Sequence, residues 1–445
     1  MPRSWALFER SLSAAAARGV ATFFDAHGDG PQWCDGSACH FARLEIGNLR
    51  GEGHAVRCFG HCHDAPVARS GADVIGRTRA PSRVSSLTTP IVFRHLLAGR
   101  DGAADHATLP EGDAILAAIT RAGLRGRGGA AYPTAAKWRV ARDTPAKDRW
   151  VVANGDEGDP GAWVDRLLLE HTPHAILAGM RCCARVIGAS QGIVYIRHEY
   201  PAAQAAMRAA IADGAFDDFS VRVVGGHGSY VCGEESALLR AIAGRRAEPH
   251  PKPPYPAESG LDGLPTIVQN IETLSIVPWI ASTGQGAETK VVCVSGAVGR
   301  PGAVEVAFGT SIREVLAHVG GCPPGKAWKM ALIGGPMGRV IPACDFDVRI
   351  GYNTLPGLGH AGMVLLDDTV SARAVYDHYV EFGIAESCGN CTPCRVGTSL
   401  LARYRGRSEA ERIFETMEMG SLCGFGTGVS QPLRDLWTHF GGELC

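Results

Sequence analysis

The sequence predicts a multidomain α/β protein: a domain built on a mostly parallel sheet, then a small α+β module, then a helical, cysteine-rich C-terminal domain. Three observations predict this order. Short apolar runs alternate with longer helical patterns over residues 90–282, which is typical of parallel sheets. Short strand-like runs around one helix follow over 285–370, and residues 372–445 combine helical patterns with the densest group of cysteines. A length of 445 residues also suits several domains.

Composition narrows the class of protein. With 45% hydrophobic and 20% charged residues, the chain can bury sizeable cores. Its 44 Lys and Arg nearly balance its 45 Asp and Glu, which gives no reason to expect nucleic-acid binding. Glu9, Arg10 and Arg18 interrupt the first apolar stretch, and no run of 18 apolar residues occurs. We therefore expect a cytoplasmic protein without a membrane span, whose 15 cysteines serve metal or redox chemistry rather than disulfides.

The N-terminal block covers residues 1–85. A helical pattern runs from Ser4 to Phe24, and a region rich in cysteine and histidine follows. The segment from Arg79 to Ser86 has no apolar period and is predicted to be a linker. Four cysteines form two short-spaced pairs with 18 residues between them: Cys34, Cys39, Cys58 and Cys62. Such pairs suit a [2Fe–2S] cluster or zinc, and the alternative is a vestigial fold whose cysteines bind nothing.

The later elements follow from local patterns. In the α/β domain, strands are expected at 150–153, 193–196 and 221–224, and a helix at 201–212. In the small module, strands are expected at 291–294, 304–306 and 331–333. A helix is expected at 310–319, with Thr310 or Ser311 as its N-cap.

The C-terminal cysteines are the strongest single signal. Cys388, Cys391 and Cys394 are separated by two residues each, and Cys423 lies among glycines further along the chain. Three thiolates in one tight loop plus a distant fourth are typical of a [4Fe–4S] cluster. The alternatives are zinc, which usually takes separated pairs, and unligated thiols. Cys445 is interpreted as a terminal thiol, and the others as buried apolar side chains: Cys182, Cys183, Cys232, Cys293, Cys322 and Cys344.

A glycine-rich loop at residues 123–138 indicates phosphate binding. Its closely spaced glycines free backbone N–H groups to face phosphate oxygens, and Lys137 can supply the countercharge. The spacing fits neither a Walker A loop nor the dinucleotide fingerprint, so a simple tight turn is the alternative. Polar motifs nearby favour a ligand. Residues 154–161 place amide and carboxylate groups after an apolar strand, where α/β sheets bind ligands, and residues 228–236 again interleave glycine and carboxylates.

Together these motifs resemble the NADH-binding flavoprotein subunit of respiratory complex I (the 51-kDa type) and the matching subunits of soluble NAD-reducing hydrogenases and NAD-dependent formate dehydrogenases. The resemblance covers about residues 90–430. It implies FMN contacts at Gly126, Arg127, Gly128, Lys137, Asn154, Asp156, Gly233, Glu234, Asn270 and Thr273.

The same resemblance implies how NADH is bound. Tyr132 matches the aromatic residue on the nicotinamide side, and Lys252 and Tyr255 match the residues that hold the adenosine half. Glu157 and Glu235 match the carboxylates of the nicotinamide pocket, which we assign as the catalytic pair.

The family also accounts for the other domains. Residues 285–370 are similar to its ubiquitin-like (SLBB-type) module. The N-terminal block resembles an abbreviated form of the thioredoxin-like [2Fe–2S] subunit that partners this family. Two features depart from the pattern: Gln269 replaces an asparagine, and only 28 residues separate Cys394 from Cys423. The segment Gly359–Asp368 looks closest to formate dehydrogenases.

The predicted function is therefore electron transfer. NADH delivers a hydride, an iron–sulfur cluster takes one electron at a time, and a flavin exchanges electrons with both. We expect a subunit of a larger complex with a [2Fe–2S] thioredoxin-like subunit and a catalytic molybdenum/tungsten or hydrogenase subunit. A free-standing diaphorase acting on a carrier such as ferredoxin is a second hypothesis. A non-catalytic zinc and nucleotide-binding scaffold is a third, against which Lys137, Asn154, Glu157 and Glu235 argue.

Overall fold

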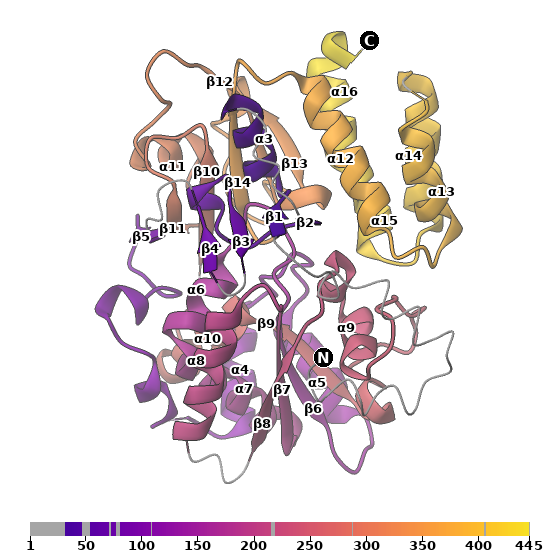
Figure 1. The fold of residues 1–445 in the computed structure, drawn as a ribbon. Helices are drawn as coiled ribbons and strands as arrows, with labels where there is room; N and C mark the ends of the chain where they lie inside the picture. Colours follow the sequence, from indigo (N-terminus) through magenta and orange to yellow (C-terminus); the bar gives the residue numbers. More distant parts are fainter. Residues whose placement is uncertain are drawn as a thin grey trace.

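The computed structural model describes residues 32–46, 54–70, 73–76, 81–107, 109–214, 219–286, 288–404 and 406–444. The helix predicted from Ser4 to Phe24 lies outside these residues. Three sheets and a C-terminal group of helices make up the described chain (Figure 1).

The central α/β domain is built on four parallel strands in the order β8-β7-β6-β9. These are β6 (Trp150–Gly155), β7 (Gln191–Ile196), β8 (Ser220–Gly225) and β9 (Thr266–Asn270). The first three confirm the predicted strands, whereas the sequence did not reveal β9. Because β7 and β9 lie on opposite sides of β6, the strand order reverses there. The carboxyl ends of β6 and β9 therefore lie at a switch point of the strand order, beside which sheets of this kind bind ligands in a crevice.

Helices cover both faces of this sheet (Figure 1). Alternate residues of β6 explain why: Val151 and Ala153 belong to one core, and Trp150 and Val152 to another. The second core includes α9 (Glu235–Ile242). The first includes α4 (Gly112–Arg121), α5 (Thr134–Asp143), α6 (Val164–His171), α7 (Pro173–Ile187), α8 (Pro201–Asp213) and α10 (Ile271–Thr283). Helix α8 confirms the helix predicted at 201–212.

The small module contains a six-stranded sheet in the order β13-β12-β14-β10-β11-β5. It comprises β5 (Arg83–Ser86), β10 (Thr289–Gly296), β11 (Gly302–Ala307), β12 (Trp328–Ile333), β13 (Arg339–Pro342), β14 (Gly362–Asp367) and helix α11 (Ile312–His318). The predicted strands and helix are confirmed. Ser311 is the N-cap, and it forms a capping box with Glu314.

The predicted linker from Arg79 to Ser86 is wrong for its second half. Residues 83–86 form β5, which pairs in parallel with β11 and places Ser85 opposite Val304. An edge strand with half-exposed side chains needs no apolar alternation, so its sequence carried no strand signal. The chain therefore contributes to the small module before it enters the α/β domain.

The described N-terminal residues form a small unit of their own. Strands β1 (Gln32–Cys34), β2 (His54–Val56), β3 (Ala68–Ser70) and β4 (Asp73–Ile75) pair in the order β2-β1-β3-β4. Helix α3 (Ser37–Ile46) connects the parallel pair β1 and β2, while β3 and β4 are antiparallel to their neighbours. The thioredoxin-like assignment of this unit stays a prediction.

The C-terminal residues are helical, as predicted. They form α12 (Ala372–Glu386), α13 (Thr392–Leu401), α14 (Arg407–Gly420), α15 (Gly424–Gly428) and α16 (Ser430–Leu444). Cys391 is the N-cap residue of α13, and Cys423 is that of α15. Among the described helices, none combines the length and apolar character needed to cross a bilayer.

Candidate active site

The glycine-rich loop folds back on itself before it enters α5. The Gly126 N–H donates to the Tyr132 carbonyl (2.9 Å), and the Thr134 N–H donates to the Leu124 carbonyl (2.9 Å). Gly129 has a φ of 112°, which favours glycine. A Cβ on Gly128 would lie 3.0 Å from the Cβ of Asn270, so this loop closely approaches the end of β9.

The loop meets the N-terminus of α10. The Asn270 side chain caps this helix by accepting a hydrogen bond from the Thr273 N–H (3.1 Å). The Arg127 N–H donates to the Thr273 hydroxyl oxygen (2.9 Å). Glycine-rich backbone beside a helix N-terminus is a site for an anionic phosphate. The structure thus brings together Gly126, Gly128, Asn270 and Thr273.

The Arg127 side chain points into the protein interior, where it forms an ion pair. Its guanidinium is buried and lies 3.1 Å from the Glu272 carboxylate. Only its backbone joins the loop. Gln269, which departs from the family pattern, accepts a hydrogen bond from the Trp138 indole (3.3 Å).

Four charged side chains meet beside this loop. Lys137 Nζ lies 2.6 Å from Glu235 Oε2. Lys252 Nζ lies 2.9 Å from carboxylate oxygens of both Glu234 and Glu235. Burial opposes ionisation of Glu235, but the two lysines outweigh it and lower its pKa. Glu235 is therefore an ionised, partly exposed carboxylate held between two cations.

Two exposed aromatic residues accompany this charged group. Tyr132 is 56% exposed and Tyr255 is 53% exposed. Lys252 Nζ lies 5.8 Å from the centre of the Tyr255 ring. Exposed rings of this size can stack on a planar ligand, and the roles that the resemblance implies for the two tyrosines stay predictions.

The polar motif after β6 is organised around Asn154. Its amide donates to the Gly233 carbonyl (3.0 Å), and its oxygen accepts from the Asp156 N–H (3.0 Å). Burial raises the pKa of Asp156 to about 7, against the opposing charge of Arg197. This carboxyl can therefore exchange a proton near neutral pH.

Glu157 occupies a different position from Glu235. It is fully buried, and its carboxylate accepts hydrogen bonds from the N–H groups of Asp165 (3.1 Å) and Arg166 (3.2 Å). The Tyr200 hydroxyl is 3.3 Å from it. In this structure Glu157 thus accepts hydrogen bonds from the first turn of α6. Its place in the nicotinamide pocket stays a prediction.

The four C-terminal cysteines converge where α12, α13 and α15 meet. Burial and the neighbouring thiols Cys388, Cys391 and Cys423 raise the pKa of Cys394 to about 12. Apolar side chains cover the group, including Phe382 and Phe425.

This donor set fits an iron–sulfur cubane. Backbone N–H groups near the sulfurs favour the thiolate form: that of Asn390 acts to lower the pKa of Cys388, and those of Phe425 and Gly426 that of Cys423, against the effect of burial. Such N–H groups stabilise a cluster and tune its potential. Within the described ranges, no three potential ligands are arranged around a single metal ion.

The four N-terminal cysteines also come together, and all are buried. Cys58 and Cys62 place their sulfurs 3.4 Å apart, and the nearby thiols of Cys39 and Cys58, together with burial, raise the pKa of Cys34. The Gly60 N–H donates to Cys58 Sγ (3.3 Å). The spacing of the pairs in the sequence therefore corresponds to one buried thiol cluster.

The Glu386 carboxylate, which the sequence did not indicate as functional, links the N-terminal cysteines, the polar motif at residues 228–236 and the C-terminal cysteines. Glu386 accepts from the Arg57 guanidinium (2.9 Å) and from the Tyr230 N–H (3.0 Å). Arg57 precedes Cys58, Glu386 precedes Cys388 by two residues, and Tyr230 belongs to the polar motif at residues 228–236. No local pattern could have indicated this contact, because its partners are far apart in the chain.

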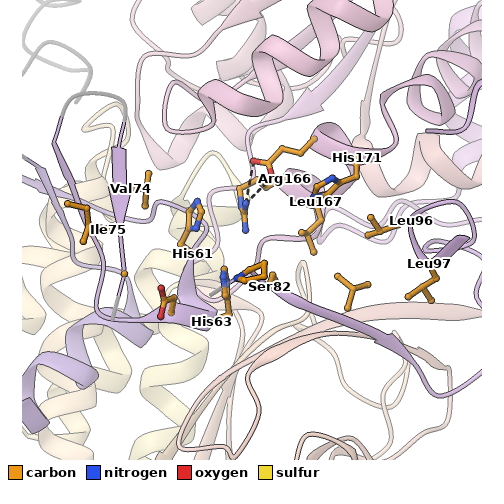
Figure 2. Close-up of a pocket in the computed structure, with 15 residues that line it drawn as sticks. His61, His63, Val74, Ile75, Ser82, Leu96, Leu97, Arg166, Leu167 and His171 are labelled. Atoms are coloured by element: carbon orange, nitrogen blue, oxygen red, sulfur yellow. Dashed lines mark hydrogen bonds and ion pairs between the residues drawn. The ribbon is translucent and has the colours of Figure 1, made fainter. Parts of the chain in front are cut away.

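A cavity of about 700 Å³ lies away from this crevice, between the N-terminal unit and α6 (Figure 2). His61, His63, Arg166, Glu170 and His171 line it. The Arg166 guanidinium is already paired with Glu170 (3.0 Å). None of the residues predicted to bind a cofactor lines this cavity.

Comparison with known proteins identifies the domains. The family model of the Nuo51 FMN-binding domain matches residues 119–279. The SLBB domain matches 291–341, and the NADH-ubiquinone oxidoreductase-F iron–sulfur binding region matches 374–444. The ubiquitin-like module, the FMN-binding domain and the iron–sulfur domain are therefore confirmed.

Whole-chain relatives agree. The chain is 37% identical to the NADP-reducing hydrogenase subunit HndC of Solidesulfovibrio fructosivorans, covering 78% of each protein. It is 36% identical to an NADH-quinone oxidoreductase subunit of Rhizobium meliloti, covering 75% of this chain and 88% of that protein. A chain in the crystal structure of an NAD⁺-reducing [NiFe]-hydrogenase in the H₂-reduced state superposes with a TM-score of 0.86 at 30% identity, covering 98% of this chain and 88% of that one.

These findings confirm FMN, a [4Fe–4S] cluster and NAD(H) as the cofactors and substrate. They also confirm an NADH dehydrogenase-type oxidoreductase. The chain belongs to the family of NADH-binding flavoprotein subunits, which is represented in NADH-quinone oxidoreductase.

Proposed function

We propose that this chain exchanges a hydride between NAD(H) and FMN in the crevice beside β6 and β9, as the diaphorase subunit of a soluble NAD-dependent formate dehydrogenase. The main support for this site is a group of paired charged side chains beside the glycine-rich loop: Lys137, Glu235, Lys252 and Glu234. Single electrons would pass between FMN and the cluster of the C-terminal cysteines. The complex would work in the cytoplasm with a [2Fe–2S] thioredoxin-like subunit and a molybdenum or tungsten subunit.

The residues divide the work by their chemistry. When bound, FMN supplies both hydride and single-electron chemistry. The backbone of Gly126 and Gly128 and the N-terminus of α10 would bind its phosphate. Lys137 would add positive charge to this end of the crevice. The amide and carboxyl groups of Asn154 and Asp156 would hydrogen-bond the remaining polar atoms.

The NAD(H) half of the crevice would depend on Glu235. Its ionised carboxylate holds two lysines in place and offers an acceptor for an amide or hydroxyl group. Tyr132 and Tyr255 would stack on the ligand, and Lys252 would face its adenosine half. No acid–base residue is required for hydride transfer, so Glu235 would orient the substrate rather than move a proton.

A Glu235→Gln variant tests this role. Because the amide cannot pair with both lysines, kcat/KM for NADH is expected to fall about tenfold, equivalent to about 1.4 kcal/mol. The measurement is NADH-dependent ferricyanide reduction at equal flavin content. Glu415→Gln, on the exposed face of α14, is the matched control. Normal turnover in Glu235→Gln would exclude the assignment.

We further propose that Cys34, Cys39, Cys58 and Cys62 hold a [2Fe–2S] cluster, since all four thiols are buried together. Replacing Cys58 with serine is expected to reduce the iron content from about six to about four per chain. The measurement is an iron and zinc assay on anaerobically purified protein. Cys182→Ser, a buried thiol of α7, should leave the iron content unchanged. Zinc, or about four irons in the unsubstituted protein, would contradict the proposal.

The anaerobic visible spectrum tests the core function. Flavin absorbance is expected to bleach when NADH is added, together with iron–sulfur absorbance changes. A colourless protein indifferent to NADH would overturn the assignment of the crevice.

The partner complex needs a separate experiment. A complex isolated through a tag on this chain is expected to reduce NAD⁺ with formate and to contain molybdenum or tungsten. An NAD-reducing hydrogenase is the second candidate, because NAD⁺-reducing [NiFe]-hydrogenase chains are similar over nearly the whole chain at 29–30% identity. Nickel and H₂-dependent NAD⁺ reduction would support that candidate and contradict the first.

A further inference from the structure

We propose that His360 of the SLBB module is a positioning residue of the flavin site, which holds Asn270 in place at the start of α10. The proposal rests on the proposed function, in which Asn270 belongs to the FMN-binding end of the crevice. His360 lies just before β14 and is separated from Asn270 by 90 residues, so the small module would directly support the flavin site.

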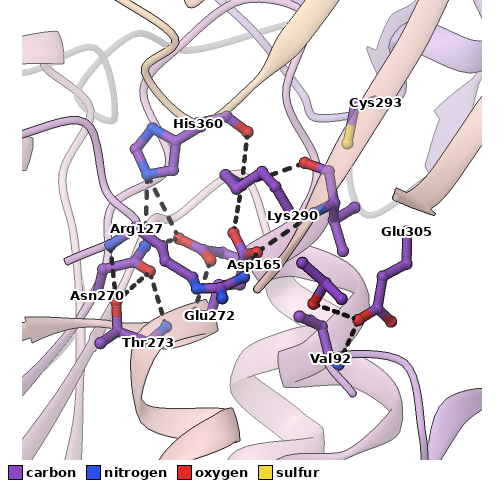
Figure 3. A network of polar contacts seen from close by, with 12 residues as sticks. Val92, Arg127, Asp165, Asn270, Glu272, Thr273, Lys290, Cys293, Glu305 and His360 are labelled. Carbon is purple, nitrogen blue, oxygen red and sulfur yellow. Dashed lines mark hydrogen bonds and ion pairs between the residues drawn. The ribbon is translucent and has the colours of Figure 1, made fainter. Parts of the chain in front are cut away.

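The contacts of His360 join two carboxylates and one amide. Figure 3 shows those with Asp165 and Asn270. Its Nδ1 lies 3.1 Å from Asp159 Oδ2. Its Nε2 lies 3.7 Å from Asp165 Oδ2 and 3.4 Å from the Asn270 amide nitrogen. That amide donates to the same Asp165 oxygen at 2.7 Å. Imidazole and amide therefore converge on one carboxylate oxygen.

The Asn270 side chain is consequently held at both ends. Its nitrogen is bound to Asp165, and its oxygen accepts from the Thr273 N–H that begins α10. Burial and the charge of Glu157 raise the pKa of Asp165 well above its ordinary value, and a His360 cation beside it acts in the opposite direction, favouring the ionised carboxylate that accepts best from the amide. Loss of the cation would weaken this acceptor and release the cap.

Asp159 fixes the imidazole from the other side. Its carboxylate accepts hydrogen bonds from the Tyr230 hydroxyl (2.7 Å) and from the backbone N–H of His360 (3.3 Å). A Cβ on Gly335 would lie 2.9 Å from the Asp159 carboxyl carbon, and one on Gly359 would lie 3.0 Å from its Oδ2. Backbone of the SLBB module thus packs closely around the Asp159 side chain. Because Asp159 is held in this way, its contact with the His360 ring restricts the rotation of that ring.

The surrounding charges favour a protonated His360. Burial lowers its pKa, but the hydrogen bond and charge of Asp159, with the charges of Asp165 and Glu157, raise it to about 9. Other charged groups of the network are Glu272, Lys290 and Arg127. The pKa of Tyr230 lies well above its ordinary value of 10. Burial also raises the pKa of Asp165 and of Glu157, so the His360→Gln variant is needed to show that a change near pH 9 comes from His360.

The experiment measures FMN affinity of the full chain from the fluorescence of flavin released on dilution. In His360→Gln the dissociation constant is expected to rise on the order of tenfold at pH 7, as for loss of one charge-assisted hydrogen bond. In the unsubstituted protein it should stay constant from pH 7 to 8 and rise through pH 9 as the imidazolium loses its proton. The variant should lack this step.

The control is His318→Gln, a histidine of the same module that bonds to Ser85 instead. It should retain both the affinity and the pH step. Equal affinity in His360→Gln, or a flat pH profile in the unsubstituted protein, would overturn the proposal even if the variant folds poorly, since the second measurement needs no variant. A protein that binds no FMN at any pH would contradict the proposed function instead.

Discussion

Replacing Cys423 with serine is expected to remove the C-terminal cluster and to abolish electron transfer beyond the flavin. Cys423 supplies the distant thiol, and α15 begins at its backbone. Without it, the remaining cysteines of one loop cannot complete a four-thiolate site. The iron content should fall by about four per chain, and the cluster signal should disappear from the electron paramagnetic resonance spectrum of the reduced protein.

The flavin should survive this change, because the crevice lies in another domain. NADH should still bleach the flavin absorbance of Cys423→Ser at normal flavin content. Cys344→Ser is the matched control, since Cys344 is an exposed thiol of the small module. An unchanged cluster signal in Cys423→Ser would mean that a different residue completes the site.

Replacing Glu272 with glutamine is expected to cause the largest loss of stability. Glu272 and Lys290 are fully buried and Arg127 nearly so, and the carboxylate pairs with both cations. Removing its charge takes away the carboxylate that pairs with both buried cations, which costs about 3–5 kcal/mol of the free energy of unfolding. Urea denaturation followed by tryptophan fluorescence measures this loss.

A surface pair provides the control for Glu272. Glu411 lies 2.7 Å from Arg434 with 41% of its side chain exposed, so Glu411→Gln should cost less than about 1 kcal/mol. Equal losses in the two variants would contradict the importance of the buried group.

The stability that the buried Glu272 carboxylate contributes should depend on pH. Burial opposes ionisation of Glu272, but Lys290 and Arg127 outweigh it and lower its pKa below the ordinary 4.5. A lowered pKa stabilises the fold above pH 4.5, and this contribution is lost as the pH falls further. The stability difference between the unsubstituted protein and Glu272→Gln should therefore shrink below pH 4.5. A constant difference down to pH 3 would contradict this account.

The sequence was most informative about features that depend on spacings of a few residues. Cys388, Cys391 and Cys394 lie within one turn-rich loop, so their convergence follows from the chain itself. The same holds for the glycine-rich loop, where Gly126 and Gly128 need no distant residue to expose their backbone. The strands β6, β7 and β8 were predictable because apolar runs and helical patterns alternate strongly along the chain.

Residues whose partners are distant were predicted less well. Glu157 and Glu235 are assigned to one pocket, which stays a prediction; the sequence did not indicate that Glu157 lies in the interior at the start of α6 whereas Glu235 lies between two lysines. The FMN contact expected at Arg127 also stays a prediction, and the sequence did not indicate that its guanidinium pairs with Glu272. A sequence motif identifies a loop but does not determine which way each side chain points.

By itself, then, the sequence determined the order of the FMN-binding, SLBB and iron–sulfur domains and the cofactor classes, because these depend on composition and on spacings of a few residues. The cysteine ligands stay a prediction from the same spacings. Only the tertiary structure decided that β5 completes the sheet of the SLBB module, that Glu386 joins three regions, and that His360 reaches Asn270. Each of these contacts joins segments far apart in the chain. Such contacts form only when separate cores pack together, and no local pattern of residues records them.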